Sequence, residues 1–380
     1  MLAVALKMLL GDRAKVLGLI SGVAFATLLV TQQSALFMGL MVRAQNVIAD
    51  ARGVDIWVMD PAVEYLDLVR PMRDSELFRV RGVPGVATAS RFFKGATAVK
   101  TATGKMRNAL LLGVDEATWT GVPRNFVMGS LADLQRPDAI AIDRYGFAQL
   151  WPAEPLSWGK TLELNDRRAI VTAITDAAPA FAAQVIIYTR YSQAINYLPN
   201  GRNQLSFVLT TIDAGANVER VAERISQITG LRAETADGFS RRTVSYYLRN
   251  TGITMSFVTT IALGAIVGCA IVGLTFSLFV AANLPQYALL KIIGITNARI
   301  LHLVLFQASV IVFVGYWVGM ALATSFFHFI STPTSALRGF FIPWWIAAYV
   351  AAGVTFFTLL AISTSLRRVL LVDPTDVFRS

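Results

Sequence analysis

Four long runs with almost no charge constrain this chain more than any other feature of its sequence. They lie at 16–42, 251–283, 299–330 and 344–366, and each is long enough to cross a bilayer, which takes roughly 20 apolar residues as a helix. Charged residues make up only 15% of the chain, against roughly 25% in an ordinary soluble domain. We therefore predict a membrane protein with four transmembrane helices.

The first run could also be a cleaved signal peptide, because the basic residues Lys7, Arg13 and Lys15 precede it. Its apolar character continues to Val42, however, which is longer than the apolar region of such a peptide, and no clear small-x-small site ends it. We expect an uncleaved anchor. The residues before it, 1–15, are expected to form a cytoplasmic segment with a weak amphipathic pattern that could lie on the inner membrane surface.

The distribution of basic residues predicts the orientation of the spans. Residues 43–250 hold 25 Lys and Arg against 21 Asp and Glu, whereas the rest of the chain holds 9 against 3. The basic flanks are 1–15, 284–298 and 367–380, and short basic flanks stay in the cytoplasm. We therefore place both termini in the cytoplasm of a bacterium, with the chain in the inner membrane. The domain 43–250 and the loop 331–343 then lie outside, with anionic lipid rather than nucleic acid as the partner of the excess positive charge.

The extracytoplasmic domain 43–250 is predicted to be α+β. Alternating apolar residues predict strands, and Val218, Val221, Ile225 and Ile228 share one face of a predicted helix that ends at Gly230. We expect residues 241–250 to continue as a helix into the second span, as a stalk. The predicted strands lie at 54–60, 107–115, 138–143, 167–176, 184–189 and 204–213.

No catalytic arrangement is visible in this domain, which contains neither histidine nor cysteine. That excludes a Ser-His-Asp or Cys-His triad within it and argues against a zinc hydrolase. The sequence WGKT at Trp158 has Glu154 where a phosphate-binding loop needs its first glycine. The adjacent carboxylates Asp115 and Glu116 are interpreted as a solvated turn. We expect no enzyme activity, no metal and no cofactor in this chain.

The membrane part also lacks a source of energy of its own. No acidic residue lies between Asn250 and Val372 or within the first run, although buried carboxylates carry the ions of proton- and sodium-coupled transporters. Any energy must then come from another subunit. Cys269 is interpreted as a packing residue. His302 and His328 are 26 residues apart in the third run, too far to share one ligand within a subunit. We favour packing or solvated roles for both histidines, with haem ligation by His328 as the alternative.

Two pairs of glycines have the G-x-x-x-G spacing that lets helices approach closely. Gly264 and Gly268 lie in the second run, and Gly315 and Gly319 lie in the third. We interpret all four as helix-packing residues, either within the chain or between two copies of it.

The short segment 284–298 carries the strongest functional signal. Its sequence LPQYALLKIIG has a proline suited to a first helical turn and a glycine that can end a helix, with Tyr287, Leu290 and either Ile292 or Ile293 expected on an apolar side. An apolar surface at the inner face of a membrane needs a cover. One interpretation is a turn that lies on lipid. The sharper one is a docking helix for a soluble partner.

At this point the chain resembles the FtsX/MacB-like permeases of ABC transporters (type VII fold). The order of one span, a large outer domain and three further spans is similar along essentially the whole chain. QYALLKIIG is similar to the family's coupling segment E-I-G-L-L-R-A-I-G, with Lys291 at the basic position, Gly294 at the last glycine and Gln286 in place of the acid. DPTDVFR, at 373–379, and LLLGVD, at 110–115, resemble further family segments. LPQYALLK and GVAFATLLV also resemble the DevC branch, the permeases of glycolipid exporters in cyanobacteria.

The resemblance implies a MacB-like periplasmic core for the outer domain and a non-catalytic permease subunit for the chain. It implies two copies of the chain, a dimer of a separate ABC ATPase that binds ATP and Mg²⁺, and a mechanism in which the ATPases move the coupling helices. A periplasmic membrane fusion protein and an outer-membrane channel would complete the exporter. The cargo could be a glycolipid or other amphiphile, a peptide or a drug-like compound. The alternative is an FtsX-like signal transducer that regulates an outer partner. The coupling residues implied are Gln286, Tyr287, Leu289, Leu290, Lys291, Ile293 and Gly294.

Overall fold

The computed structural model describes residues 2–11, 13–152, 154–181, 183, 185–198, 205–331 and 340–371. These residues fall into two compact units. The first unit consists of 2–38, 252–331 and 340–371 and is entirely helical. The second consists of 39–251 and holds all the strands. The C-terminal segment 373–379 that contributed to the sequence prediction lies outside the described residues.

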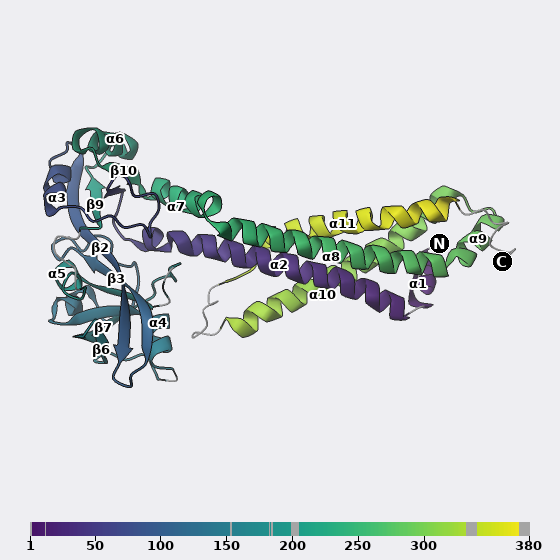
Figure 1. Cartoon of the computed structure of the whole chain (residues 1–380), viewed down its shortest axis with the longest axis horizontal. Coiled ribbons are helices and arrows are strands. Elements are labelled where there is room, and N and C mark those ends of the chain that lie inside the picture. Colours follow the sequence, from purple (N-terminus) through teal and green to yellow (C-terminus); the bar gives the residue numbers. More distant parts are fainter. Residues whose placement is uncertain are drawn as a thin grey trace. The chain divides into compact units, whose positions relative to one another are not determined.

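The helical unit contains six helices, among them four that are long and apolar enough to cross a membrane: α2, α8, α10 and α11 (Figure 1). The four predicted spans are thus confirmed as helices, although α2 is longer than the run 16–42 at both ends and α11 extends beyond residue 366. The bounds are α1 Leu2–Gly11, α2 Arg13–Asp50, α8 Gly252–Ala282, α9 Leu284–Ile292, α10 Asn297–Ile330 and α11 Trp344–Leu371.

The four glycines pack against α2 within the same chain. A Cβ on Gly315 would lie 2.6 Å from the Cβ of Val23, and one on Gly319 would lie 2.5 Å from the carbonyl oxygen of Ala24. On α8, a Cβ on Gly268 would collide with Ala26. Small residues therefore let α8 and α10 approach α2 closely. Because Gly264, Gly268, Gly315 and Gly319 are all buried inside one chain, they offer no surface to a second copy.

The second unit is built around a ten-stranded mixed sheet in the order β10-β1-β9-β2-β3-β8-β5-β7-β4. Strand β6 lies off this path and pairs with both β2 and β7, so that β2, β3, β8, β5, β7 and β6 form a closed ring. The strands are β1 Ile56–Met59, β2 Val86–Thr101, β3 Met106–Val114, β4 Phe126–Met128, β5 Ala139–Asp143, β6 Thr161–Leu164, β7 Arg167–Thr175, β8 Val185–Arg190, β9 Phe207–Ile212 and β10 Arg232–Thr235. The helices are α3 Asp74–Arg81, η1 Leu131–Gln135, α4 Arg144–Leu150, α5 Tyr191–Ala194, α6 Val218–Thr229 and α7 Ala236–Asn250.

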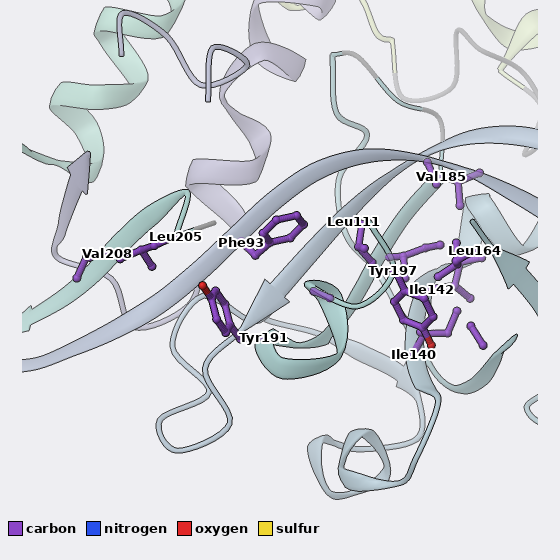
Figure 2. Packing of buried hydrophobic residues seen from close by; sticks show 14 of the residues in the cluster. Phe93, Leu111, Ile140, Ile142, Leu164, Val185, Tyr191, Tyr197, Leu205 and Val208 are labelled. Carbon is purple, nitrogen blue, oxygen red and sulfur yellow. The ribbon is translucent and has the colours of Figure 1, made fainter. Parts of the chain in front are cut away.

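Two hydrophobic cores fill this unit, one on each face of the sheet. In β1, Ile56 and Val58 belong to one core and Trp57 and Met59 to the other, as the alternation of a strand requires. Figure 2 shows the first core, in which Phe93 and Leu111 lie among residues contributed by several other strands. Full burial of each such side chain stabilises the fold by about 1.5–3 kcal/mol.

The predicted α+β class is confirmed, and so are all six predicted strands in position. The predicted helix is α6, and Gly230 ends it in the left-handed conformation with φ +71° while its N–H donates to the carbonyl of Ser226. One expectation is wrong in detail: α7 does not run on into the second span, because Thr251 is extended (φ −114°, ψ 151°) and α8 begins at Gly252.

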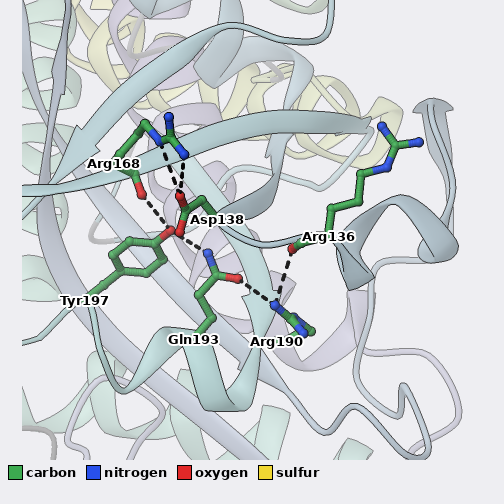
Figure 3. Close-up of polar contacts among 6 residues, drawn as sticks. All are labelled: Arg136, Asp138, Arg168, Arg190, Gln193 and Tyr197. Carbon is green, nitrogen blue, oxygen red and sulfur yellow. Dashed lines mark hydrogen bonds and ion pairs between the residues drawn. The ribbon is translucent and has the colours of Figure 1, made fainter.

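A polar cluster joins several elements of the ring of strands (Figure 3). Arg168 donates twice to Asp138, at 3.2 and 3.0 Å, and its carbonyl accepts from the hydroxyl of Tyr197 at 3.2 Å. The side chain of Gln193 donates to the same hydroxyl at 2.6 Å and accepts from Arg190. These contacts fix the starts of β5 and β7 to α5 and the end of β8, and so position the ring closure.

Candidate functional site between α8 and α10

The connection from α8 to α10 folds as a short separate helix because residues at its two ends terminate the helices there. Asn283 ends α8 by donating its side-chain amide to the carbonyl of Phe279 at 2.8 Å. Pro285 occupies the first turn of α9, where its missing N–H costs nothing. Gly294 follows α9 with φ +88°, a conformation that favours glycine, and its N–H donates to the carbonyl of Lys291 at 3.0 Å. The helix is therefore separated from both neighbouring spans.

One face of α9 is anchored inside the helical unit. Tyr287 and Ala288 are fully buried. The hydroxyl of Tyr287 donates to the side-chain oxygen of Gln307 on α10 at 3.2 Å, and the side-chain nitrogen of Gln307 donates to the carbonyl of Ala5 on α1 at 3.0 Å. Burial raises the pKa of the Tyr287 hydroxyl well above its ordinary value of 10.0, so it stays protonated as a donor. The pair links α9, α10 and α1 in one buried contact.

The opposite face of α9 presents apolar side chains outward. Leu289 is 51% exposed, Ile292 57% and Ile293 69%. Gln286 and Gly294 are also exposed, whereas Leu290 is half-buried against the core of this unit. The sequence placed Tyr287 and Leu290 on the exposed apolar side, and the structure turns both inward.

Ile292 was not among the coupling residues that the sequence assigned. The spacing i, i+3, i+4 of Leu289, Ile292 and Ile293 is the signal that would have found it, because residues at this spacing share one helical face. The exposed face is therefore a compact apolar patch of these three residues, which we call the α9 patch.

The α9 patch has a positive surrounding field. Lys291 lies in α9 between Leu289 and Ile292, and Arg299 lies in the first turn of α10. The chain has no acidic residue between Asn250 and Val372. Such a surface suits a partner that offers an apolar pocket beside acidic groups. It contains no nucleophile or acid–base pair, and the described residues contain no cluster of three or more metal-ligating side chains.

The other sequence candidates have structural roles. Glu154 forms an ion pair with Lys160 of the WGKT segment, and this segment leads into strand β6 rather than into the helix that a phosphate-binding loop requires. The carboxylate of Asp115 accepts from the N–H groups of Arg91 at 3.1 Å and Ala117 at 3.0 Å. Glu116 accepts from the N–H of Ser192 at 2.9 Å. This turn therefore fastens backbone, and the expectation of a solvated turn is wrong for Asp115, which is buried because its carboxylate accepts from backbone N–H groups.

The histidines and the cysteine of the spans are single residues on helix surfaces. His302 is exposed and contacts the carbonyl of Ala298 with its Nδ1 at 2.7 Å, and His328 is exposed near the far end of α10. The thiol of Cys269 on α8 lies 3.2 Å from the carbonyl of Phe357 on α11. The Cys269 contact joins α8 to α11, and none of these three residues belongs to a group of three or more metal-ligating side chains among the described residues.

Comparison with known proteins finds similarities in the helical unit and along the chain. Residues 258–374 match the family model of the FtsX-like permease C-terminal domain. Over 367 residues the chain is 26% identical to an uncharacterized ABC transporter permease of Mycobacterium tuberculosis, found in strains CDC 1551 / Oshkosh and H37Rv; the match covers 94% of this chain and 93% of the relative.

Two solved structures resemble part of the chain. The periplasmic region of MacB from Actinobacillus actinomycetemcomitans is 15% identical, with a TM-score of 0.38, and the match covers 55% of this chain and 99% of that one. The extracellular domain of the noncanonic ABC-type transporter YknZ from Gram-positive bacteria is 13% identical, with a TM-score of 0.35, and the match covers 48% and 98%.

Proposed function

We propose that this chain, whose residues 258–374 form an FtsX-like permease domain, is the permease subunit of an ABC exporter and takes its energy from a separate ATPase. The observation that carries the proposal is the α9 patch. A nine-residue helix between two spans is anchored on one face by Tyr287 and presents Leu289 and Ile292 on the other, with the exposed Ile293 directly after its end. That is the form of a docking element, because an exposed apolar patch at a membrane surface needs a partner.

The coupling proceeds through rigid elements. An ATPase dimer that binds ATP and Mg²⁺ would hold the α9 patch and displace α9 as it closes. Through the buried bonds of Gln307, a displacement of α9 acts on α10 and α1 together. Helix α2 is unbroken from Arg13 to Asp50 and can carry motion along its length. The output is movement of the extracytoplasmic domain.

One cavity of the helical unit is too small to hold a cargo molecule. The cavity between α2, α8 and α11 is about 110 Å³ and is lined mostly by apolar residues, among them Val30, Ile261 and Val354. Pockets that hold small molecules are typically about 300–1,000 Å³. The cargo, an amphiphile such as a glycolipid, a peptide or a drug-like compound, therefore travels outside this cavity. The further parts of the proposed exporter are a second copy of the chain, a periplasmic adaptor and an outer-membrane channel.

The test measures stimulation of the ATPase that co-purifies with the chain from native membranes. Each isoleucine of the α9 patch retains more than half of its surface for a partner, and burial of the rest is worth about 1 kcal/mol or more. Ile292→Ser and Ile293→Ser are expected to weaken binding of the ATPase at least about fivefold, with loss of stimulation. The matched control is Ile228→Ser, since Ile228 on α6 is also 57% exposed.

Equal stimulation by the α9 variants and by the Ile228→Ser control would refute the docking role. Export itself is then measured as ATP-dependent movement of a labelled lipid in vesicles that hold the complex. If the ATPase is stimulated but no cargo moves, the signal-transducer alternative takes its place.

A further inference from the structure

A cleft of about 300 Å³ in the second unit gathers arginine side chains. Strand β10, helix α7 and the loop after β1 line it, and all of its lining residues belong to this unit. Helix α7 contributes Arg242, Ser245, Tyr246 and Arg249. These four share one face of the helix, because they follow the spacing i, i+3, i+4, i+7. One wall of the cleft is therefore a polar helix face with an arginine at each end.

Two of the arginines are crowded around one carbonyl oxygen. Arg232 on β10 donates to the carbonyl of Val63 at 3.0 Å, and Arg242 donates to the same oxygen at 2.8 Å. Glu234 lies 3.0 Å from Nε of Arg242 and compensates one positive charge. Both arginines are half-buried, so water and salt screen their mutual repulsion incompletely. The arrangement favours a further negative group in the cleft.

Arg249 brings a third guanidinium group to the cleft. Its side chain is exposed, and no hydrogen bond or ion pair joins it to any other described residue. Among the described residues, Glu64 is the only acid that lines the cleft, so with Glu234 three arginines meet two carboxylates. Neither of the segments 199–204 and 332–339, which are not described, contains an acidic residue. One positive charge of the cleft therefore remains uncompensated.

The place of Arg249 in the chain brings it close to a membrane surface. Helix α8, which is long and apolar enough to cross a bilayer, begins three residues later at Gly252. Three residues of extended chain span at most about 11 Å. The headgroup region on each side of the hydrocarbon core is roughly 5–7 Å thick. The guanidinium of Arg249 is therefore within reach of the lipid headgroups at this end of α8.

We propose that the cleft binds the phosphate of a phospholipid headgroup in the membrane surface that α8 enters. Guanidinium groups form paired, charge-assisted hydrogen bonds with phosphate oxygens, and the Ser245 hydroxyl lies beside them as a further donor. A phosphodiester carries one negative charge, which matches the uncompensated positive charge of the cleft. The acyl chains stay in the bilayer. The inference does not depend on the proposed transport function.

The test measures lipid binding to the full chain, delipidated in a maltoside detergent, by native mass spectrometry. Arg249→Gln removes one charged donor and should weaken binding of the first phosphatidylglycerol about tenfold. The matched control is Arg241→Gln, because Arg241 lies on the same helix and is exposed but does not line the cleft. This control removes the same charge, so it cancels any general attraction between a basic surface and lipid, and it should bind as the wild type does.

Two further ligands separate the phospholipid from other sources of binding. Diacylglycerol with the same acyl chains lacks the phosphate and should bind equally to the wild type and to Arg249→Gln. Glycerol 3-phosphate has the phosphate without acyl chains and should bind at least about tenfold more weakly than the phospholipid. A phosphatidylglycerol with a photoreactive headgroup should label residues 242–250 in the wild type and label them much less in Arg249→Gln.

Equal affinity of Arg249→Gln and Arg241→Gln for phosphatidylglycerol would overturn the proposal. An equal loss of diacylglycerol binding on Arg249→Gln would do the same, because the cleft would then not select phosphate. If glycerol 3-phosphate binds as tightly as the phospholipid, the cleft takes a soluble phosphate compound and the lipid assignment is wrong. Labelling confined to segments other than 242–250 would also contradict the site.

Discussion

Loss of the carboxylate of Asp67 should destabilise the second unit strongly. Asp67 accepts from the ammonium of Lys94 on β2 at 2.6 Å and from the hydroxyl of Tyr247 on α7 at 2.7 Å. The side chain of Lys94 is 6% exposed and that of Asp67 is 19% exposed. Asp67→Leu therefore leaves a buried ammonium without its partner and a phenol without its acceptor.

The magnitude follows from the burial. Removal of one partner of a buried ion pair costs about 3–5 kcal/mol, and because Asp67 keeps some contact with water we expect the lower end, about 3 kcal/mol. A domain of this kind has a total stability of about 5–15 kcal/mol, so the loss is a large fraction of it. Replacement of both partners, Asp67→Leu with Lys94→Met, removes the uncompensated charge and should be more stable than Asp67→Leu alone, although the Tyr247 hydroxyl still lacks its acceptor at a cost of about 1 kcal/mol or more.

The assay is denaturant unfolding of residues 39–251 produced as a separate polypeptide, since this unit holds its own two cores. The free energy of unfolding is compared among the wild type, both single variants and the double variant. A cost below about 1 kcal/mol for Asp67→Leu would contradict the reasoning. So would a double variant whose cost equals the sum of the two single costs, because the pair would then not be coupled.

Three further predictions concern the spans, the pH dependence and the topology. Gly319→Ala should destabilise the chain in detergent by about 1–3 kcal/mol, because its Cβ would lie 2.5 Å from a carbonyl oxygen on α2. The control Gly353→Ala, whose Cβ would have no atom within 4 Å, should leave the melting temperature unchanged. Equal melting temperatures for the two variants would exclude the close approach. Burial, followed by the nearby Asp67 carboxylate, raises the pKa of Tyr247 above its ordinary value of 10.0, so above pH 10 the folded state holds a proton that the unfolded state releases. The contribution of Tyr247 to stability should therefore be complete below about pH 10 and be lost as the pH rises further, which pH-dependent unfolding measures and a Tyr247→Phe variant should reduce. A cysteine placed at Arg241 should react with a membrane-impermeant reagent added from outside and one at Ala298 should not, and the reverse pattern would invert the topology.

The sequence alone determined the elements whose signal is local. The spans were predictable because a run of apolar residues is a property of consecutive positions, and the bilayer length selects it. Helix α6 and its end at Gly230 were predictable for the same reason, since periodicity and a left-handed glycine act within a few residues. The separate helix after α8, with Pro285 and Gly294 at its ends, belongs to this group.

Only the tertiary structure decided which face of each element is covered. Strand β2 was not predicted, because Lys94 and Gly95 interrupt its apolar pattern; Lys94 is buried there only because Asp67, distant in the sequence, neutralises it. Tyr287 was expected to face outward and is buried because Gln307 accepts its hydrogen bond. Burial of a side chain depends on residues from other parts of the chain that pack against it, and a local sequence pattern does not show which residues these are.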